Sequence, residues 1–269
     1  MPKTERVTPT VAELMSIATE AVDRAAHMIR ASAPGRVTMK GDRDPATEVD
    51  FAVEREVRDF LARRAPDVSF LGEENGQSGS SGAGLMWALD PIDGTVNFIH
   101  GLPLCGVSLG LLGRSVPQLG VIDFPFLDLR YSAVLGGGAF RGDRQLSVAN
   151  TRDLSDAVVA IGDYATGNEA ELKNLDRIRL TQKLARTVQR IRMFGSAAID
   201  LAWVAEGLID ASVMLANKPW DVAAGVVIAR EAGAVVTDRH GREHGLNSES
   251  VVAASPAISE QLAMLIDEI

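Results

Sequence analysis

The hydrophobic pattern of the chain changes near Pro66, and this change limits the possible folds most. Before Pro66, apolar residues recur at helical spacing, whereas after it they come in short runs bounded by Gly, Pro or Asp. Such runs are typical of strands. The runs are residues 68–71, 85–89, 104–112, 119–122 and 130–134. We expect these runs to form one sheet and the preceding segments to form helices.

Two helices are predicted ahead of the sheet. In the first, apolar residues from Val11 to Ile29 follow helical spacing, and Thr10 and Glu13 stand in the register of a capping box. The second begins at residues 47–50, and one apolar face runs along it. That face consists of Val49, Val53, Val57, Phe60 and Leu61.

The second half of the chain mixes strands and helices. We expect strands at 158–161, 209–215, 234–237 and 250–253, with helices near 170–185, 196–206, 221–232 and 256–268. With 269 residues and 46% hydrophobic content, the chain can build one large core. We therefore expect a single α/β domain, 1–269, of two packed lobes, roughly 1–150 and 151–269.

Residues 75–84 form the most linker-like stretch. The sequence NGQSGSSGAG is rich in Gly and Ser, which favours a flexible coil. We interpret it as a mobile loop within the domain.

Composition excludes several classes of function. A formal net charge of -9 and the lack of a basic run argue against nucleic-acid binding. The single Cys105 cannot close an internal disulfide, and the four histidines show no zinc spacing. The N-terminal residues do not match a secretory signal, and no apolar stretch approaches the roughly 20 residues that cross a bilayer. We expect a cytoplasmic protein without a membrane partner.

The string WALDPIDGTVNF, residues 87–98, carries the clearest chemical signal. An apolar strand ends at Asp90, a proline turns the chain, and Asp93 follows three residues after Asp90. Both carboxylates and the intervening Ile92 carbonyl can point at one place, and such oxygens suit Mg²⁺. Gly94 allows close approach of the backbone, and a helix that starts near Thr95 would present free amides to a phosphate.

Further acidic residues end apolar segments in the same way. Glu73 and Glu74 follow the run 68–71, Trp220 and Asp221 open a late helix, and Asp50 lies near the start of an earlier one. Each alone reads as an ordinary helix cap or a solvated acid. Together they favour a shared metal site.

Three other chemistries fit less well. A phosphatase with an aspartate nucleophile two residues before Asp93 is excluded, since Pro91 stands there. Residues 106–110 match the nucleophile elbow around Ser108, with His240 and His244 as conceivable partners, but no strand-to-helix break is evident. We interpret Ser108 as packed strand and Cys105 as a small buried hydrophobe. The glycines at 136–142 indicate a hairpin rather than a dinucleotide site.

These motifs together resemble the inositol monophosphatase family of Mg²⁺-dependent, lithium-sensitive phosphatases. The family shows an Asp, a Glu-Glu pair, a DPIDGT or DPLDGT string and a Trp-Asp pair in that order. Here these are Asp50, Glu73 with Glu74, residues 90–95, and Trp220 with Asp221. Weaker matches include Lys40, the GGGAF hairpin, residues 194–207 and residues 231–238. The resemblance covers about residues 10–265.

The resemblance implies a layered α/β/α/β/α fold, a homodimer, and hydrolysis of a small phosphorylated metabolite by Mg²⁺-activated water. It implies that the metal ligands are Glu73, Asp90, the Ile92 carbonyl, Asp93 and Asp221. Asp50 and Thr95 resemble the pair that orients the attacking water with Glu73. The implied substrate contacts are Gly94, Thr95, Gly195, Ser196, Ala197 and Asp221. Without metal, we expect the acids to repel one another, with shifted pKa values or partial disorder.

The substrate is less well defined than the chemistry. Inositol-specific members commonly carry a Glu seven residues before the late Asp, and this chain has Met214 there. A site without that carboxylate should discriminate less among hydroxylated leaving groups. Asp163 and Lys218 could supply other contacts. Inositol 1-phosphate is the default substrate, with histidinol phosphate, fructose 1,6-bisphosphate and adenosine 3',5'-bisphosphate as alternatives.

A function of a different class is a non-catalytic regulator that keeps the fold and binds a partner protein. The complete set of acids argues against it, since degenerate enzymes usually lose a ligand.

Overall fold

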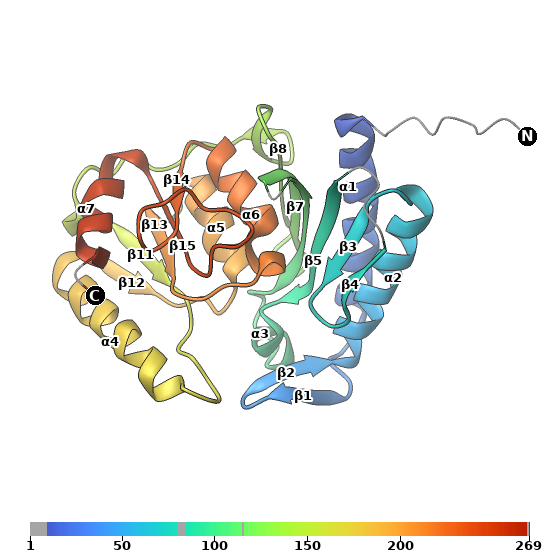
Figure 1. The fold of residues 1–269 in the computed structure, drawn as a ribbon, viewed down its shortest axis with the longest axis horizontal. Helices are drawn as coiled ribbons and strands as arrows, with labels where there is room; N and C mark the ends of the chain where they lie inside the picture. Colours follow the sequence, from blue (N-terminus) through green and yellow to red (C-terminus); the bar gives the residue numbers. More distant parts are fainter. Residues whose placement is uncertain (1–9, 80–83, 115, 268) are drawn as a thin grey trace, which may run out of the picture.

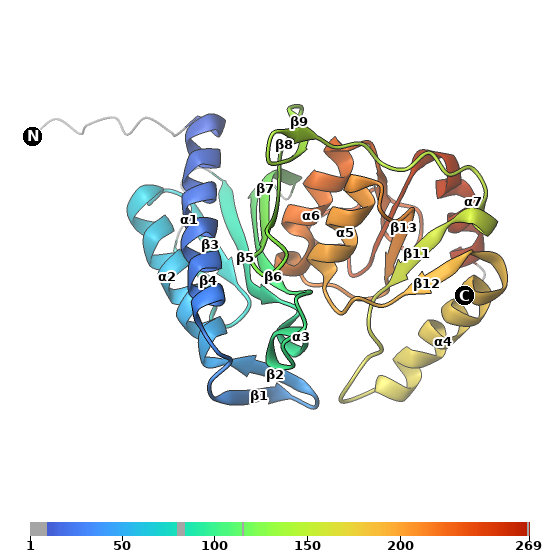
Figure 2. The ribbon, with the colours of Figure 1, turned by 180° about the vertical axis from the view of Figure 1, so that it is seen from behind.

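The structure is a computed structural model that describes residues 10–79, 84–114, 116–267 and 269, and it stacks helices and sheets in alternating layers (Figure 1). The first layer holds α1 (Val11–Ala31) and α2 (Glu48–Arg64), which pack on an eight-stranded sheet. The middle layer holds α5 (Ala197–Glu206) and α6 (Pro219–Glu231), and a five-stranded sheet lies beyond it. The outer face of that sheet carries α4 (Ala170–Thr187) and α7 (Pro256–Asp267), as Figure 2 shows from behind. This is the expected α/β/α/β/α order.

The two predicted N-terminal helices are confirmed, and their caps are formed by side chains. The Thr10 hydroxyl accepts the amide of Glu13 at 3.2 Å, and the Glu13 carboxylate accepts the Thr10 amide at 2.7 Å. Thr47 caps α2 in the same way, with Asp50 as the reciprocal partner. Each cap satisfies amides that have no partner within the helix.

The eight-stranded sheet contains all five strands predicted for it. Its spatial order is β10-β9-β8-β7-β6-β5-β3-β4, and only the β3–β5 pair is parallel. The strands are β3 (Ser69–Gly72), β4 (Gly76–Ser78), β5 (Leu85–Asp93), β6 (Gly106–Gly113), β7 (Val116–Phe124), β8 (Leu129–Val134), β9 (Gly138–Arg141) and β10 (Arg144–Gln145). The predicted hairpin at 136–142 comprises the turn after β8 and the strand β9, and Glu231 of α6 accepts the amides of Gly136 and Gly138, each at 2.8 Å.

Two predictions about this sheet were inexact. The strand that was expected to end at Asp90 continues to Asp93, with an irregular register against β6 between these residues. Such an irregularity re-aims side chains at a strand end. The predicted loop 75–84 contains β4, whose three residues pair with β3, while residues 80–83 lie outside the described part. Backbone pairing therefore outweighs the flexible composition at 76–78.

The five-stranded sheet has the order β12-β11-β13-β15-β14. Its strands are β11 (Val158–Ile161), β12 (Arg190–Arg192), β13 (Ala211–Met214), β14 (Val235–Thr237) and β15 (Val251–Ala254). The remaining elements are the hairpin β1 (Val37–Gly41) and β2 (Asp44–Thr47), the short helix α3 (Thr95–Ile99) and a 3-10 turn, η1 (Leu154–Asp156). No helix in the described part of the chain combines the length and apolar character that a membrane span needs.

Two facing glycines bring the middle layer close to the first sheet. Gly110 of β6 and Gly120 of β7 are directly paired, and both lie under α6. A Cβ atom on Gly110 would stand 2.7 Å from the Ala223 Cβ, and one on Gly120 would stand 2.6 Å from the Ala224 carbonyl oxygen. Because neither glycine has a side chain, α6 packs close to the sheet. This close packing determines the position of Asp221 at the start of the helix.

Candidate active site

Asp50 and Thr95 form the contact predicted for them. Asp50 is fully buried in the first turn of α2, where its Oδ2 accepts the Thr47 amide at 2.8 Å and the Thr47 hydroxyl at 2.5 Å. Its Oδ1 lies 3.2 Å from the Thr95 Oγ1. The same hydroxyl lies 3.0 Å from the Ile92 carbonyl oxygen. These contacts link the N-terminal cap of α2 to the end of β5 through the Thr95 hydroxyl.

Asp90 and Asp93 end β5 in different surroundings. Asp93 accepts hydrogen bonds from the Ser196 hydroxyl and, at 3.1 Å, from the Ala198 amide, both at the start of α5. Asp90 is 5% exposed, and its Oδ1 is buried without a hydrogen-bond partner among the described residues. A buried carboxylate oxygen without a hydrogen-bond partner is costly, and a cation is one kind of group that would offset this cost.

Glu73 and Glu74 share a lysine. Lys40 of β1 donates to the Glu73 Oε1 at 2.7 Å and to the Glu74 Oε1 at 2.9 Å. Burial works against the charge of Lys40, but the two carboxylates outweigh it and raise the pKa of the lysine. Burial raises the pKa of Glu74 to about 7 despite Lys40. The lysine therefore supplies positive charge to the acidic cluster.

Glu54 is a part of this site that the sequence reasoning missed. It is fully buried in α2, and its carboxylate accepts the amides of Glu74 at 2.7 Å and Asn75 at 2.9 Å. It thereby fixes the turn after β3 that carries Glu73. A signal was present, because Glu54 falls in helical register with Val57 and Asp50 on the buried face of the helix.

Asp221 reaches the cluster from the start of α6. Its Oδ2 accepts the Lys218 amide at 2.7 Å. Burial raises the pKa of Asp221 to about 7, and the charges of Asp93 and Glu73 add to this effect. Burial also raises the pKa of Asp90, together with the charges of Glu73, Asp93 and Asp221. The raised pKa values agree with the expectation that these acids lie close enough for their charges to disfavour one another.

The cluster fits a divalent cation in its chemistry, although it is not drawn tightly around one point. Among the described residues, no three acidic, histidine or cysteine groups stand in a metal-holding arrangement. Glu73, Asp93 and Asp221 are instead bonded to Lys40, Ser196 and Lys218. The donors are nevertheless all oxygen atoms, and the partnerless Asp90 Oδ1 lies among them. Hard oxygen ligands of this kind suit Mg²⁺.

Two adjoining hollows meet at the acidic cluster. One, of about 230 Å³, is lined by Asp90, Asp93 and Asp221. The other, of about 430 Å³, is lined by Glu73 and Thr95. Residues shared by both linings are Gly94, Asp163 and Gly195, and the first hollow also includes Ser196, Ala197 and Met214. All residues expected to contact substrate therefore face one continuous region.

Position 94 has no room for a side chain, so a glycine is required there. Its φ of 87° is in the left-handed region, and a Cβ atom would stand 2.8 Å from the Leu104 carbonyl oxygen. The predicted helix start at Thr95 is confirmed, although α3 spans only five residues.

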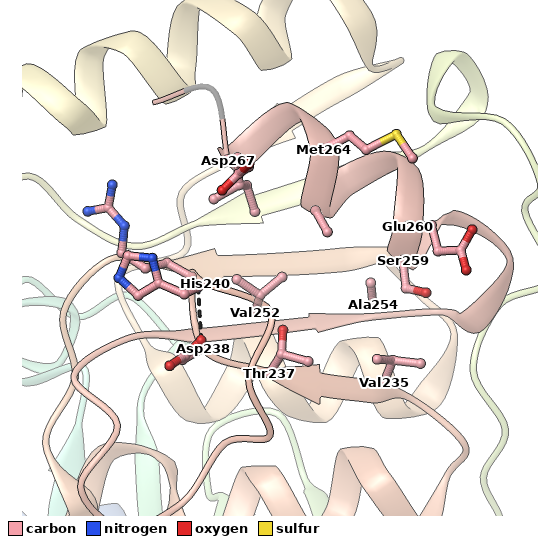
Figure 3. A pocket seen from close by; sticks show the side chains of 14 residues that line it. Val235, Thr237, Asp238, His240, Val252, Ala254, Ser259, Glu260, Met264 and Asp267 are labelled. Carbon is pink, nitrogen blue, oxygen red and sulfur yellow. Dashed lines mark hydrogen bonds between the residues drawn. The ribbon is translucent and has the colours of Figure 1, made fainter.

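A separate hollow lies near the C-terminus. It measures about 440 Å³ and is lined by β14, β15 and α7, including Val235, Val252 and Met264 (Figure 3). Its lining includes none of the residues predicted for the site. Its lining mixes apolar and polar side chains, among them Asp238 and His240, and the acidic region is the better candidate because the predicted residues gather there.

The serine-hydrolase alternative is wrong. Ser108 lies fully buried within the continuous strand β6, so no nucleophile elbow exists. His240 lines the C-terminal hollow, away from this strand. Cys105 is buried, and burial raises the pKa of its thiol to about 12, as expected for an inert thiol.

The fold and the acidic region together define a layered α/β protein of the phosphatase type. The model of the inositol monophosphatase family matches residues 4–269, and the chain belongs to this family. The chain is 35% identical to a probable inositol 1-monophosphatase ImpA of Mycobacterium tuberculosis over 261 residues, 96% of each protein. It is 32% identical to the Nus factor SuhB of Pasteurella multocida, covering 93% of this chain and 94% of that protein. The solved structure of the extragenic suppressor protein SuhB of Bartonella henselae matches with a TM-score of 0.89 at 30% identity, covering 95% of this chain and 98% of that one.

Proposed function

We propose that this protein is a Mg²⁺-dependent phosphomonoesterase that hydrolyses inositol 1-phosphate or a similar small phosphorylated polyol. The observation that supports it most is that two adjoining hollows are lined by Asp90, Asp93 and Asp221 in one and by Glu73 and Thr95 in the other, with the Thr95 hydroxyl 3.2 Å from the Asp50 Oδ1. The membership of the chain in a phosphatase family supports the same reaction.

The residues that would hold Mg²⁺ are Glu73, Asp90, the Ile92 carbonyl, Asp93 and Asp221. When bound, the metal supplies positive charge that offsets the phosphate oxygens and lowers the pKa of water. Glu73 would be able to hold the cation and still accept from Lys40, because the two oxygens of a carboxylate offer about four acceptor sites. The backbone amides of Gly94 and Thr95, which line the larger hollow, would bind phosphate oxygens.

Asp50 and Thr95 would direct the attacking water. The Thr95 hydroxyl lies within hydrogen-bond distance of the Asp50 Oδ1, so it can pass its own proton there while it accepts one from water. Burial raises the pKa of Asp50, which makes its carboxylate a better proton acceptor. Glu73 orients the same water. The oxygen of water then displaces the alcohol from phosphorus, and no protein nucleophile is required.

Phosphate release from a panel of esters tests this proposal. The panel contains inositol 1-phosphate, glycerol 2-phosphate, histidinol phosphate, fructose 1,6-bisphosphate and adenosine 3',5'-bisphosphate, each with Mg²⁺ and with chelator. We expect release from at least one ester, and we expect chelator to abolish it. Asp93→Asn should reduce the rate by at least about 100-fold, because a ligand and its negative charge are lost. Asp123→Asn, a buried acid of β7 outside the region, is the matched control.

A regulator that binds a partner protein is the second candidate, and the name of the Pasteurella relative favours it. Full activity in chelator would contradict the metal mechanism. If no ester in the panel is cleaved with Mg²⁺, the phosphatase proposal fails and the regulator becomes the better hypothesis.

A further inference from the structure

Asp200 lies in the wall of the smaller hollow and has no role in the proposed mechanism. It belongs to the first turn of α5 and is 2% exposed. Its Oδ2 lies 3.3 Å from the Ser212 hydroxyl, which donates to it. Its Oδ1 is buried and has no hydrogen-bond partner among the described residues. One oxygen of this carboxylate is therefore held by the Ser212 hydroxyl, and the other has no hydrogen-bond partner in the described part of the chain.

The position of Asp200 in the hollow suggests what that partner is. Ser212 and Met214 are two residues apart on β13, so both project from the same face of the strand toward α5. Met214 is 4% exposed and packs against Gly162 with its apolar side chain, so it offers no charge to a ligand. Asp200 is the buried carboxylate in the lining of this hollow that is not among the predicted metal ligands.

The other polar groups of the wall favour a hydrogen-bond donor as the ligand. Asp163 adds a second acid to the lining of the hollow. Arg177 is the cation in that lining, and it already donates to backbone, at 3.2 Å to the Asp163 carbonyl and at 3.0 Å to the Lys173 carbonyl. With the metal ligands set aside, the acidic side chains of this wall are Asp163 and Asp200, and Asp200 is the buried one. A buried acceptor without a partner is destabilising until a donor occupies the hollow.

We propose that Asp200 determines substrate specificity by accepting a hydrogen bond from a hydroxyl or ammonium group on the leaving alcohol of the phosphate ester. This inference rests on the proposed phosphatase function and deepens it. The substrate class is a phosphate ester whose alcohol carries a second polar hydrogen, rather than a simple alkyl or aryl phosphate.

The test compares esters with and without that donor. Inositol 1-phosphate supplies hydroxyl groups, and ethanolamine phosphate supplies an ammonium group. Phenyl phosphate, a six-membered ring without a donor, is the reference. For each protein the measured quantity is the ratio of kcat/KM for a donor-bearing ester to kcat/KM for phenyl phosphate, in saturating Mg²⁺. A ratio cancels any general loss of active protein.

The variants are Asp200→Ala, which removes both oxygens, and Asp200→Asn, which keeps one acceptor oxygen and replaces the other oxygen with an amide group. We expect Asp200→Ala to lower the ratio for at least one donor-bearing ester by about 10- to 100-fold, because a donor on the buried alcohol is left without its partner. Asp200→Asn should lower it nearly as far for an ammonium donor and only a few-fold for a hydroxyl donor. The pattern thus identifies the donor.

Asp123→Ala is the matched control, because Asp123 is also a buried acid with a partnerless Oδ1 and lies outside the hollow. It should leave both ratios as in the unaltered protein. Equal ratios in the Asp200 variants and the unaltered protein would overturn the inference while leaving the phosphatase proposal intact. If the unaltered protein cleaves phenyl phosphate but neither donor-bearing ester, the inference is overturned; if it cleaves none of these three esters and none of the larger panel, the phosphatase proposal itself fails. Should both Asp200 variants prove unfolded, a preference of the unaltered protein for phenyl phosphate over both donor-bearing esters would overturn the inference.

Discussion

The glycine pair under α6 gives the sharpest test of how packing positions the site. In Gly110→Ala, the new Cβ would meet the Ala223 Cβ at 2.7 Å and the Ala224 amide nitrogen at 2.8 Å, whereas ordinary contacts begin near 3.4 Å. The helix must therefore retreat by roughly 0.7 Å, since the sheet beneath is held by strands on both sides. Overpacking of this kind costs about 1–3 kcal/mol. Asp221 moves with the helix, and a shift of about 1 Å at a catalytic group costs up to about 100-fold in rate.

Urea unfolding and phosphate release would measure both effects. Gly110→Ala should lower the free energy of unfolding by about 1–3 kcal/mol and the rate by at least about 10-fold. Gly245→Ala is the control, because its added Cβ would meet nothing within 4 Å, and it should change stability by less than about 0.5 kcal/mol.

A second substitution tests whether the helix contact is the cause. Ala223→Gly alone should cost about 1 kcal/mol through helix propensity. Combined with Gly110→Ala, it removes the nearest colliding atom, so the double variant should be more stable than the sum of the two single effects predicts. If Gly110→Ala unfolds at the same urea concentration as the unaltered protein, or if the double variant is strictly additive, the reasoning is refuted.

Three further predictions concern the cap, pH and metal. Thr47→Ala should cost about 1–2 kcal/mol in urea unfolding, because the cap of α2 is lost, whereas Thr47→Ser should recover most of it. Burial lowers the pKa of His244 to about 4, below its value in the unfolded chain. The contribution of His244 to stability is therefore fully present above about pH 6.5 and is lost as the pH falls toward 4. His244→Asn should flatten the dependence of Tm on pH in that window, and an unchanged slope would contradict this prediction. Burial raises the pKa of Asp221 to about 7, above its unfolded value, so the chelated protein should lose stability as pH rises from about 4 to 7. Mg²⁺ at 100 times its Kd should add about 2.7 kcal/mol at neutral pH, and Asp90→Asn should abolish that gain.

Features encoded within a few residues were predictable from the sequence. The capping box of Thr10 and Glu13 and the apolar face of α2 involve contacts within a turn or two, and both were predicted. The string around Asp90 and Asp93 was equally informative, because a strand end, a turn and a helix start follow one another directly.

Features that depend on residues far apart in the sequence were missed. One local feature was missed as well: residues 76–78 form a strand by pairing with the adjacent β3, although their own composition favours a coil. Asp200 looks like an ordinary acid in a first helical turn, and only the distant Ser212 and the hollow give its carboxylate a special position. The bonds from Lys40 to Glu73 and from Ser196 to Asp93 were not predicted either, because each joins residues far apart in the sequence.

The edges of the two sheets have a consequence for self-association. The long strands β5 and β7, nine residues each, lie inside the first sheet, and its outermost strands are the short β10 and β4. The second sheet ends in β12, which has arginine at two of its three positions, and in β14, where Thr237 bridges to Glu243. Short or charged edges offer few free backbone groups to a neighbouring copy. The folded protein should therefore resist strand-to-strand aggregation at concentrations where a molecule with an exposed nine-residue edge would polymerise.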